Sequence, residues 1–132
     1  MSMTDPLAAL LTRIRNANRI GRATVDSPSS KLKKNTLAVL KREGFIKDFK
    51  ELEGVTIPSV RIYLKYGRDR EKVIRHLQRV SKPGRRIYAK QVELTPLLEG
   101  QGVRIVSTPK GVLSDRECRE HNVGGEVLAE VW

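Results

Sequence analysis

The chain opens with a helical pattern of apolar positions. Four apolar residues recur at three- and four-residue intervals, which is the spacing of one helix face: Leu7, Leu10, Leu11 and Ile14. Asp5 and Pro6 mark the start of this helix, because the carboxylate can accept an orphan backbone N–H and proline suits the first helical position. The pattern leaves Arg13, Arg15 and Asn16 on or beside the outer face.

A second helix is expected to begin within the segment 27–30 and to run to about Glu43, with Gly44 as a left-handed stop. Four of its residues should face inward: Leu32, Thr36, Val39 and Leu40. A short strand at Thr24 and Val25 precedes it. Strands at 45–49 and 60–64 follow, since both segments alternate or carry β-branched and aromatic residues. The first half therefore reads as α-β-α-β-β.

The polar segment 67–70 is the natural boundary between two units. Residues 73–80 fit a helix or a strand, and we favour the strand. Beyond a Pro-Gly turn in the loop 81–86, the pattern predicts an extended segment at 87–88, a helical turn at 94–99 and a strand at 103–106. A loop then leads to a helix at 115–121, closed near 122–125, and to a strand at 127–132.

The predicted fold class is thus α+β with two small domains. Residues 1–67 form an amino-terminal α-β-α-β-β unit, and residues 68–132 form a carboxyl-terminal unit that is mostly β with a short helix. Ser114 and Glu117 have the spacing of a capping box at the start of that helix, and we interpret them as a cap.

The net charge of +11 favours a polyanionic partner. Both predicted units carry an excess of basic residues, whereas the last 22 residues have a net charge of −3. Nucleic acid is favoured over an anionic membrane face. No apolar run approaches the ~18 residues of a spanning helix. The amino terminus shows no signal-type segment, and Cys118 is the only cysteine. We therefore expect a cytoplasmic protein with no disulfide.

Residues 107–111 combine features that suit a phosphate and sugar surface. Ser107 and Thr108 offer hydroxyls, Lys110 offers a positive charge, and the backbone around Gly111 offers amides. The segment lacks the glycine and lysine spacing of a nucleotide-binding loop. It is typical of a nucleic-acid contact.

The sequence also admits two alternative functions. Cys118 and His121 share a helical face, which would suit a nucleophile and a base, or two metal ligands. Zinc needs three or four protein ligands, and His76 has no ligand-like spacing to them. A DNA-binding architectural protein also fits the charge, but the chain shows no helix-turn-helix, zinc-finger or basic-zipper pattern. We expect neither catalysis nor a cofactor nor a metal.

Several blocks of the chain, in order, resemble the family of bacterial small-subunit ribosomal protein eight. The amino-terminal and central blocks are Asp5-Pro6, residues 11–16, 29–31, 43–46, 64–66 and 81–88. The carboxyl-terminal blocks are Gly102, Ile105-Val106-Ser107-Thr108, Lys110-Gly111-Val112-Leu113, Arg119 and Gly124-Gly125-Glu126.

The resemblance implies a structural constituent of the small ribosomal subunit that binds the central domain of its ribosomal RNA during assembly. It also implies contacts with small-subunit ribosomal proteins five and twelve and, in some bacteria, repression of the protein's own operon messenger RNA. By the same resemblance the RNA contacts would be Ser107, Thr108, Lys110, Gly111, Gly124, Gly125, Glu126, Tyr88, Arg85 and Arg86 in the carboxyl-terminal unit. In the amino-terminal unit they would be Thr4, Asp5, Arg15, Asn16, Ser29, Ser30 and Lys31.

Two residues depart from the family pattern. Pro109 stands where the family usually has serine, so that position offers neither a hydroxyl nor a backbone N–H. Cys118 stands where alanine or glycine is usual, and we interpret it as a small packing residue.

Overall fold

The computed structural model describes residues 5–132, and its amino-terminal half has the α-β-α-β-β order that the sequence predicts. The elements are α1 (Pro6–Arg19), β1 (Thr24–Pro28), α2 (Lys31–Arg42), β2 (Ile46–Leu52) and β3 (Ser59–Leu64). The three strands form one antiparallel sheet in the order β1-β3-β2.

The carboxyl-terminal half is mostly β, as expected, with one short α-helix. Its elements are β4 (Leu77–Arg79), β5 (Tyr88–Ala89), the 3₁₀ turns η1 (Gln91–Glu93) and η2 (Leu98–Gly100), β6 (Val103–Thr108), β7 (Gly111–Ser114), α3 (Asp115–His121) and β8 (Gly125–Val131). The sheet order is β4-β8-β6-β7, and β5 pairs with β8 beyond the end of β4. The whole fold is α+β.

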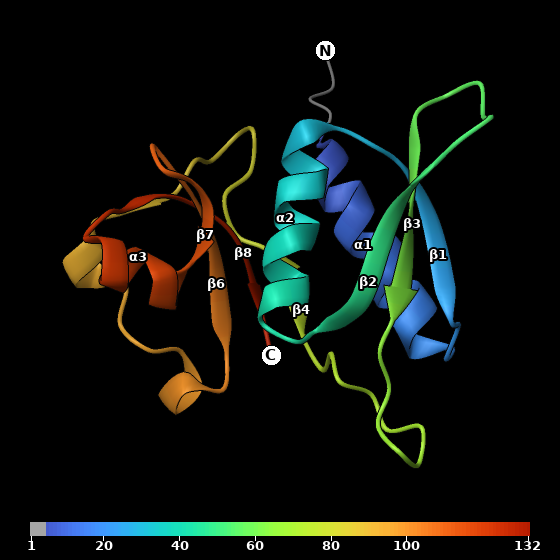
Figure 1. The fold of residues 1–132 in the computed structure, drawn as a ribbon. Coiled ribbons are helices and arrows are strands. Elements are labelled where there is room, and N and C mark those ends of the chain that lie inside the picture. Colours follow the sequence, from blue (N-terminus) through green and yellow to red (C-terminus); the bar gives the residue numbers. More distant parts are fainter. Residues whose placement is uncertain (1–4) are drawn as a thin grey trace.

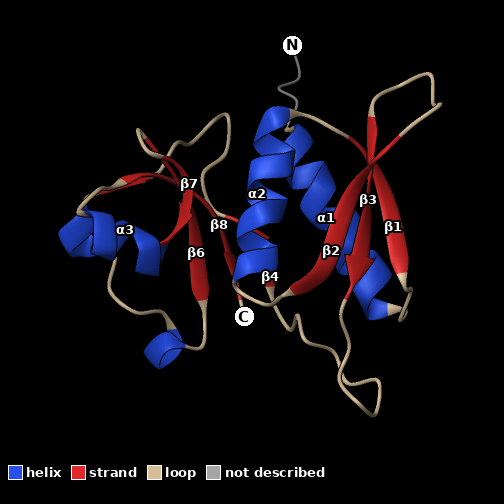
Figure 2. Ribbon diagram, in the orientation of Figure 1, coloured by secondary structure: helices blue, strands red, loops and turns tan. Residues whose placement is uncertain are grey.

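Helices α1 and α2 lie between the two sheets, and α3 covers the outer face of the second sheet (Figures 1 and 2). The largest hydrophobic cluster joins α1, α2 and the inner face of the first sheet to five residues of the second sheet: Leu77, Ile105, Leu128, Ala129 and Val131. A smaller cluster lies under α3 and consists of Leu94, Val106, Cys118 and Val127. Cys118 is fully buried there, which agrees with a packing role.

The helix ends follow the local chemistry of the sequence. Asp5 Oδ1 accepts the Ala8 N–H at 3.1 Å, and Ser30 Oγ accepts the Lys33 N–H at 3.2 Å. Gly44 has a φ of +82°, so it ends α2 in the left-handed region that glycine adopts without strain. The predicted capping box of α3 is also present.

One predicted inward position of α2 is wrong. Leu32 is 39% exposed, whereas Leu37 is fully buried and Lys33 is 6% exposed. The buried face follows the helical spacing of Lys33, Thr36, Leu37 and Leu40, and Leu32 lies to one side of it. Lys33 tolerates burial because its Nζ donates to the Pro28 carbonyl at 2.9 Å.

Three segments of the second half differ from the sequence prediction. The strand expected over 73–80 is limited to Leu77–Arg79, because the preceding chain crosses α1, where the Asn18 side-chain amide donates to the Ile74 carbonyl at 2.8 Å. The helical turn expected over 94–99 is replaced by the turns η1 and η2, since the buried Leu94 side chain anchors the segment between them. The segment 107–113 forms a hairpin instead of a loop.

The division into domains 1–67 and 68–132 remains a prediction. The two sheets are drawn from 24–64 and 77–131, but the main hydrophobic cluster takes residues from both. Two ion pairs also link α2 and the residue after it to α3: Arg42–Glu117 at 3.0 Å and Arg116–Glu43 at 3.0 Å.

Glu117 is expected to make part of the stability depend on pH. Burial raises its pKa, but the Ser114 backbone N–H and Arg42 together outweigh burial and hold the pKa below its ordinary value of 4.5. Because the folded-state pKa is depressed, this stabilisation is present above that value and is lost as the pH falls through the folded-state pKa. A Glu117→Gln variant, which keeps a capping acceptor, should be less stable than the parent at pH 7 by up to about 1 kcal/mol.

This difference should vanish in acid, and urea unfolding at several pH values measures it. Glu120→Gln is the matched control, since Glu120 is exposed and, among residues 5–132, pairs only with Arg116 at the surface. Such surface pairs contribute little. A difference between parent and Glu117→Gln that stays constant down to acid would contradict the assignment.

Candidate nucleic-acid interface

Three candidate side chains project side by side from one face of the second sheet. In the register of the strands, Glu126 of β8 lies opposite Tyr88 of β5 on one side and Ser107 of β6 on the other. Directly opposed residues of antiparallel strands point to the same face. The Tyr88 side chain is 68% exposed, and the Ser107 hydroxyl makes no hydrogen bond to residues 5–132. The row therefore offers a ring, a carboxylate and a hydroxyl together.

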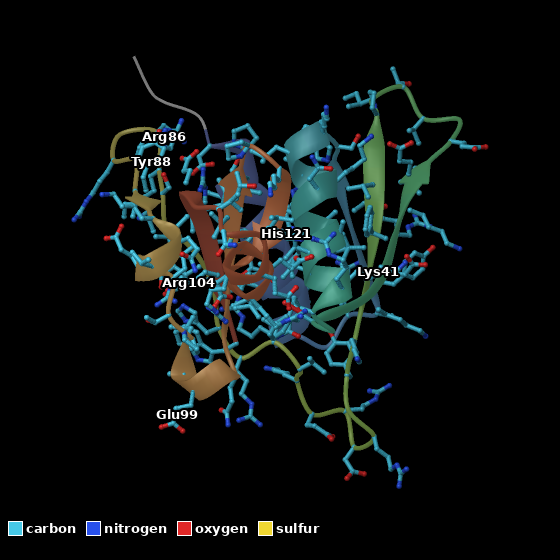
Figure 3. The ribbon with its side chains drawn as sticks, turned by 60° about the vertical axis from the view of Figure 1, so that its left-hand side comes forward. Lys41, Arg86, Tyr88, Glu99, Arg104 and His121 are labelled. Carbon is cyan, nitrogen blue, oxygen red and sulfur yellow. The ribbon has the colours of Figure 1, made fainter. Side chains whose placement is uncertain are left out.

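The Glu126 carboxylate is held in place by two donors. Its Oε2 accepts from the Ser81 hydroxyl at 2.6 Å and from Arg86 Nη1 at 2.9 Å. The fully buried Ser81 hydroxyl itself accepts from the Ile87 N–H at 3.0 Å. Figure 3 shows the Arg86 and Tyr88 side chains next to each other, Arg86 at the end of the loop 81–86 and Tyr88 in β5. The other carboxylate oxygen, Oε1, receives no hydrogen bond from the described residues, so it is available as an acceptor.

The segment after Ser107 is a tight hairpin between β6 and β7, not the loop predicted from the sequence. Thr108 pairs with Gly111, and Pro109 and Lys110 form the turn. The Thr108 hydroxyl donates to the Gly111 carbonyl at 2.7 Å and accepts the Lys110 N–H at 3.0 Å. The Thr108 hydroxyl thus stabilises the turn, and the small polar residues that suggested a loop are turn residues.

Gly111 has a backbone reason to be glycine. Its φ is +107°, and a Cβ there would meet nothing within 4 Å. A glycine with positive φ commonly follows a hairpin turn whose two central residues have negative φ, and it directs the chain into the second strand. The space around it is open, so close approach of a ligand is permitted at the hairpin tip.

Lys110 is exposed at the same tip and is directed towards α3. Its Nζ donates to the His121 carbonyl at 3.3 Å, at the carboxyl end of the helix. A cation is favourable there because the last helical carbonyls carry partial negative charge. The lysine charge is therefore fixed between the hairpin and α3.

Gly124 and Gly125 allow two backbones to approach β8. A Cβ on Gly124 would lie 2.3 Å from the Ala89 carbonyl oxygen, and a Cβ on Gly125 would lie 1.9 Å from the Ser107 carbonyl oxygen. Both contacts are far inside the distance that real atoms tolerate. These glycines hold β5 and β6 against β8, and they position the row of Tyr88, Glu126 and Ser107.

Arg85 belongs to a basic turn next to the row. Lys82 and Arg85 pair through two backbone hydrogen bonds of 3.0 and 2.9 Å around Pro83 and Gly84. Lys82, Arg85 and Arg86 are all exposed. Only Arg86 forms an ion pair within the described chain, so two of the three charges are free to meet phosphates.

The candidates near the starts of α1 and α2 lie at the end of the molecule that also carries the β6–β7 hairpin tip (Figure 1). Two of them have structural tasks: Asp5 caps α1 and pairs with the buried Arg79 at 3.2 Å, and Ser30 caps α2. The Ser29 N–H donates to the Pro58 carbonyl at 2.9 Å, and Lys31 is exposed. Thr4 lies outside the described residues.

Arg15 and Asn16 are not brought to the hairpin end. They are exposed on the later turns of α1, and Arg15 Nη1 donates to the Leu77 carbonyl at 3.1 Å. Ser81 was missed as a positioning residue, although it stands in the predicted loop 81–86. Its role depends on its contact with Glu126, 45 residues away, which no local pattern indicates.

The alternative readings find little support in the side chains. Burial raises the pKa of the Cys118 thiol to about 11, so the thiol stays protonated at neutral pH and is a poor nucleophile. Within residues 5–132, no group of three or more His, Cys, Asp and Glu side chains could hold a metal ion. No described helix is long and apolar enough to cross a membrane.

Comparison with known proteins gives a consistent result. The family described as Ribosomal protein S8 matches residues 5–132. Proteins named small ribosomal subunit protein uS8 are 53% identical in Halalkalibacterium halodurans and 54% identical in Shouchella clausii, each over 132 residues and the full length of both chains. The protein of that name in Rhodopirellula baltica is 56% identical over 131 residues, or 98% of each chain. The chain, with its two sheets and its surface row of polar side chains, therefore belongs to the ribosomal protein S8 family of the small ribosomal subunit.

Proposed function

We propose that this ribosomal protein binds the central domain of small-subunit ribosomal RNA, at a helix interrupted by an irregular internal loop, and supports subunit assembly. Its family is one of non-enzymatic ribosomal proteins, and it works in the cytoplasm as part of the ribosome. The observation that carries the proposal is the surface row of the exposed Tyr88 and the half-buried Glu126 and Ser107, beside a hairpin tip and a basic turn.

The row suits RNA better than duplex DNA. Proteins read RNA largely through unstacked bases in loops and bulges, the shallow minor groove and the 2′-hydroxyls. Tyr88 offers a ring face to an unstacked base. Glu126 Oε1 accepts from a 2′-hydroxyl or an exocyclic amine, and the Ser107 hydroxyl both donates and accepts. A regular, fully paired helix offers no unstacked base to Tyr88, so we expect these three groups to bind it only weakly.

The basic groups supply the part of the binding that does not depend on sequence. Lys82, Arg85 and Lys110 are exposed around the row and would meet backbone phosphates, and Lys31 would do so at the start of α2. Their contribution should fall steeply with added salt, because each neutralised phosphate releases counterions. Asp5 and Ser30 would contact RNA only secondarily, since their side-chain oxygens already cap helices. The Ser29 N–H serves the protein by donating to the Pro58 carbonyl, but its hydroxyl makes no hydrogen bond to residues 5–132.

Two finer partners belong to the same proposal. An operon messenger RNA that reproduces the internal loop would bind the same row and so repress translation. Small-subunit ribosomal proteins five and twelve would contact faces that the RNA leaves free.

The test compares three nucleic acids at physiological salt: a central-domain helix with its internal loop, the same helix fully paired, and duplex DNA. We expect the helix with the internal loop to bind more tightly than both the fully paired helix and the duplex DNA. Equal binding to all three, measured by fluorescence anisotropy, would refute the proposal and favour a general architectural role.

A further inference from the structure

A groove runs between α1 and the segment 72–82, on a different part of the molecule from the surface row. It encloses about 740 Å³. One wall follows a single face of α1, since Ala8, Thr12, Arg15 and Arg19 recur at helical spacing. The other wall is the chain that leads into and through β4.

Positive charge predominates in the groove, although the lining residue His76 contacts the Glu130 carboxylate at 3.2 Å. The lining contains no carboxylate but includes six basic residues: Arg15, Arg19, Lys72, Arg75, Arg79 and Lys82. Arg79 is paired with Asp5, whereas the other five form no ion pair with residues 5–132 and are exposed. An unneutralised row of like charge in a hollow attracts anions more strongly than a flat surface does.

The walls are fixed before any ligand arrives. Arg15 Nη1 donates across the groove to the Leu77 carbonyl at 3.1 Å, and the Asn18 side chain donates to the Ile74 carbonyl at 2.8 Å. Asn18 is buried, so this second bond lies at the floor of the groove. A preformed site loses less conformational entropy on binding than a mobile one.

The lining favours a nucleic-acid strand over an acidic protein segment. Protein segments usually bind through apolar or aromatic anchors in a pocket. Here the apolar lining residues Leu11, Ile74 and Leu77 are 3% exposed or less, and no exposed large hydrophobic side chain of the described chain lies in the groove. Lys82, moreover, belongs both to the groove and to the basic turn beside the surface row.

We propose that this groove binds the phosphate backbone of a single RNA strand that continues from the helix held at the surface row. The inference rests on the proposed function and extends its footprint to Arg19, Lys72 and Arg75. A positively charged groove that follows one backbone is a common way to hold single-stranded nucleic acid. The strand would pass Lys82 first and then lie between the two walls.

The test uses two triple variants with equal loss of charge. The groove variant combines Arg19→Gln, Lys72→Gln and Arg75→Gln, all at exposed positions. The control combines Lys47→Gln, Lys50→Gln and Lys65→Gln, which are also exposed but lie outside the groove. The probes are the internal-loop helix alone and the same helix with an oligouridylate tail at its 5′ or its 3′ end.

The readout is the salt dependence of binding to each probe. For one of the tailed RNAs, the groove variant should show a slope of log K against log salt that is shallower by about 2, since each lost contact with a single strand removes about 0.7. The control variant should keep the parent's difference in slope between tailed and untailed RNA. Equal slopes for the two variants on both tailed RNAs would overturn the proposal.

A second experiment tests the alternative that the groove binds an acidic protein segment instead of RNA. If oligoglutamate binds the parent and the groove variant abolishes this, while tailed and untailed RNA behave alike, the groove takes acidic protein and the RNA proposal is wrong. Failure of the proposed function would look different. The parent would then bind internal-loop and fully paired helices equally, whatever the tail contributes.

Discussion

A Gly125→Ala variant is expected to unfold more easily by about 3 kcal/mol and to lose its preference for the internal-loop RNA. The new Cβ would lie 1.9 Å from the Ser107 carbonyl oxygen and 3.2 Å from the Thr108 Cα. Both are backbone atoms of β6, so no side chain can rotate away. Strands β6 and β8 would have to separate, at the point where they align Ser107 with Glu126.

Urea unfolding followed by circular dichroism measures the change in stability, and anisotropy measures RNA preference. Gly67→Ala is the matched control. A Cβ there would lie 2.0 Å from a Glu71 carboxylate oxygen, but the atoms it meets belong to an exposed, flexible side chain, which can turn away at the cost of its hydrogen bond from the Asp69 N–H. Its cost should stay below about 1 kcal/mol, as is usual for surface substitutions. Equal urea midpoints for the two variants would contradict the close backbone contact between Gly125 of β8 and Ser107 of β6.

The features predicted correctly from the sequence are those encoded locally. Asp5 with Pro6, Ser30, Gly44 and the pair Ser114 and Glu117 each set a helix end through their own nearest backbone groups. Such signals need no knowledge of the rest of the fold. For the same reason, the starts of the three α-helices within residues 5–132 could be placed within a few residues.

The features that were predicted wrongly depend on distant contacts. The sequence predicts a loop over 107–113 because residues 107–111 are mostly small or polar. In the structure Ser107 pairs with Glu126 of β8 and residues 111–114 pair with β6, so only Pro109 and Lys110 form a turn. Residues 73–76 are irregular because Ile74 hydrogen-bonds to Asn18 of α1. Leu32 is apolar and was therefore predicted to face inward. Helix α2, however, packs through the face of Lys33, Thr36, Leu37 and Leu40, and Leu32 lies to one side of that face.

The candidate site shows the same division between local and distant information. The family resemblance pointed to Tyr88, Ser107 and Glu126, but only the strand register places the three side chains in one row. The groove is formed by α1 and residues about sixty positions later, so its charge was visible in the sequence only as a diffuse excess of arginine and lysine. The glycine pair at 124–125 was expected in turns or close to RNA, and the structure adds a contact with the protein's own backbone.

Tyr88 is where stacking on RNA can be separated from protein stability. It is 68% exposed, and its hydroxyl makes no hydrogen bond to the described residues, so a Tyr88→Ala variant should fold as stably as the parent. Stacking of one base on an aromatic side chain contributes about 1–3 kcal/mol. Binding of the internal-loop helix should therefore weaken by about that amount, which is roughly five- to 150-fold.

Two further variants decide how Tyr88 acts. Tyr88→Phe keeps the ring, so it should retain most of the affinity if stacking is the main interaction, and it should behave like Tyr88→Ala if the hydroxyl is. Val92→Ala removes another highly exposed side chain, 76% exposed, just beyond β5 and should change nothing. Because Tyr88 sits opposite Glu126, the loss should be larger for the internal-loop helix than for the fully paired one. An equal loss on both helices would mean that Tyr88 contacts only the RNA backbone, and the row would then contribute affinity without specificity.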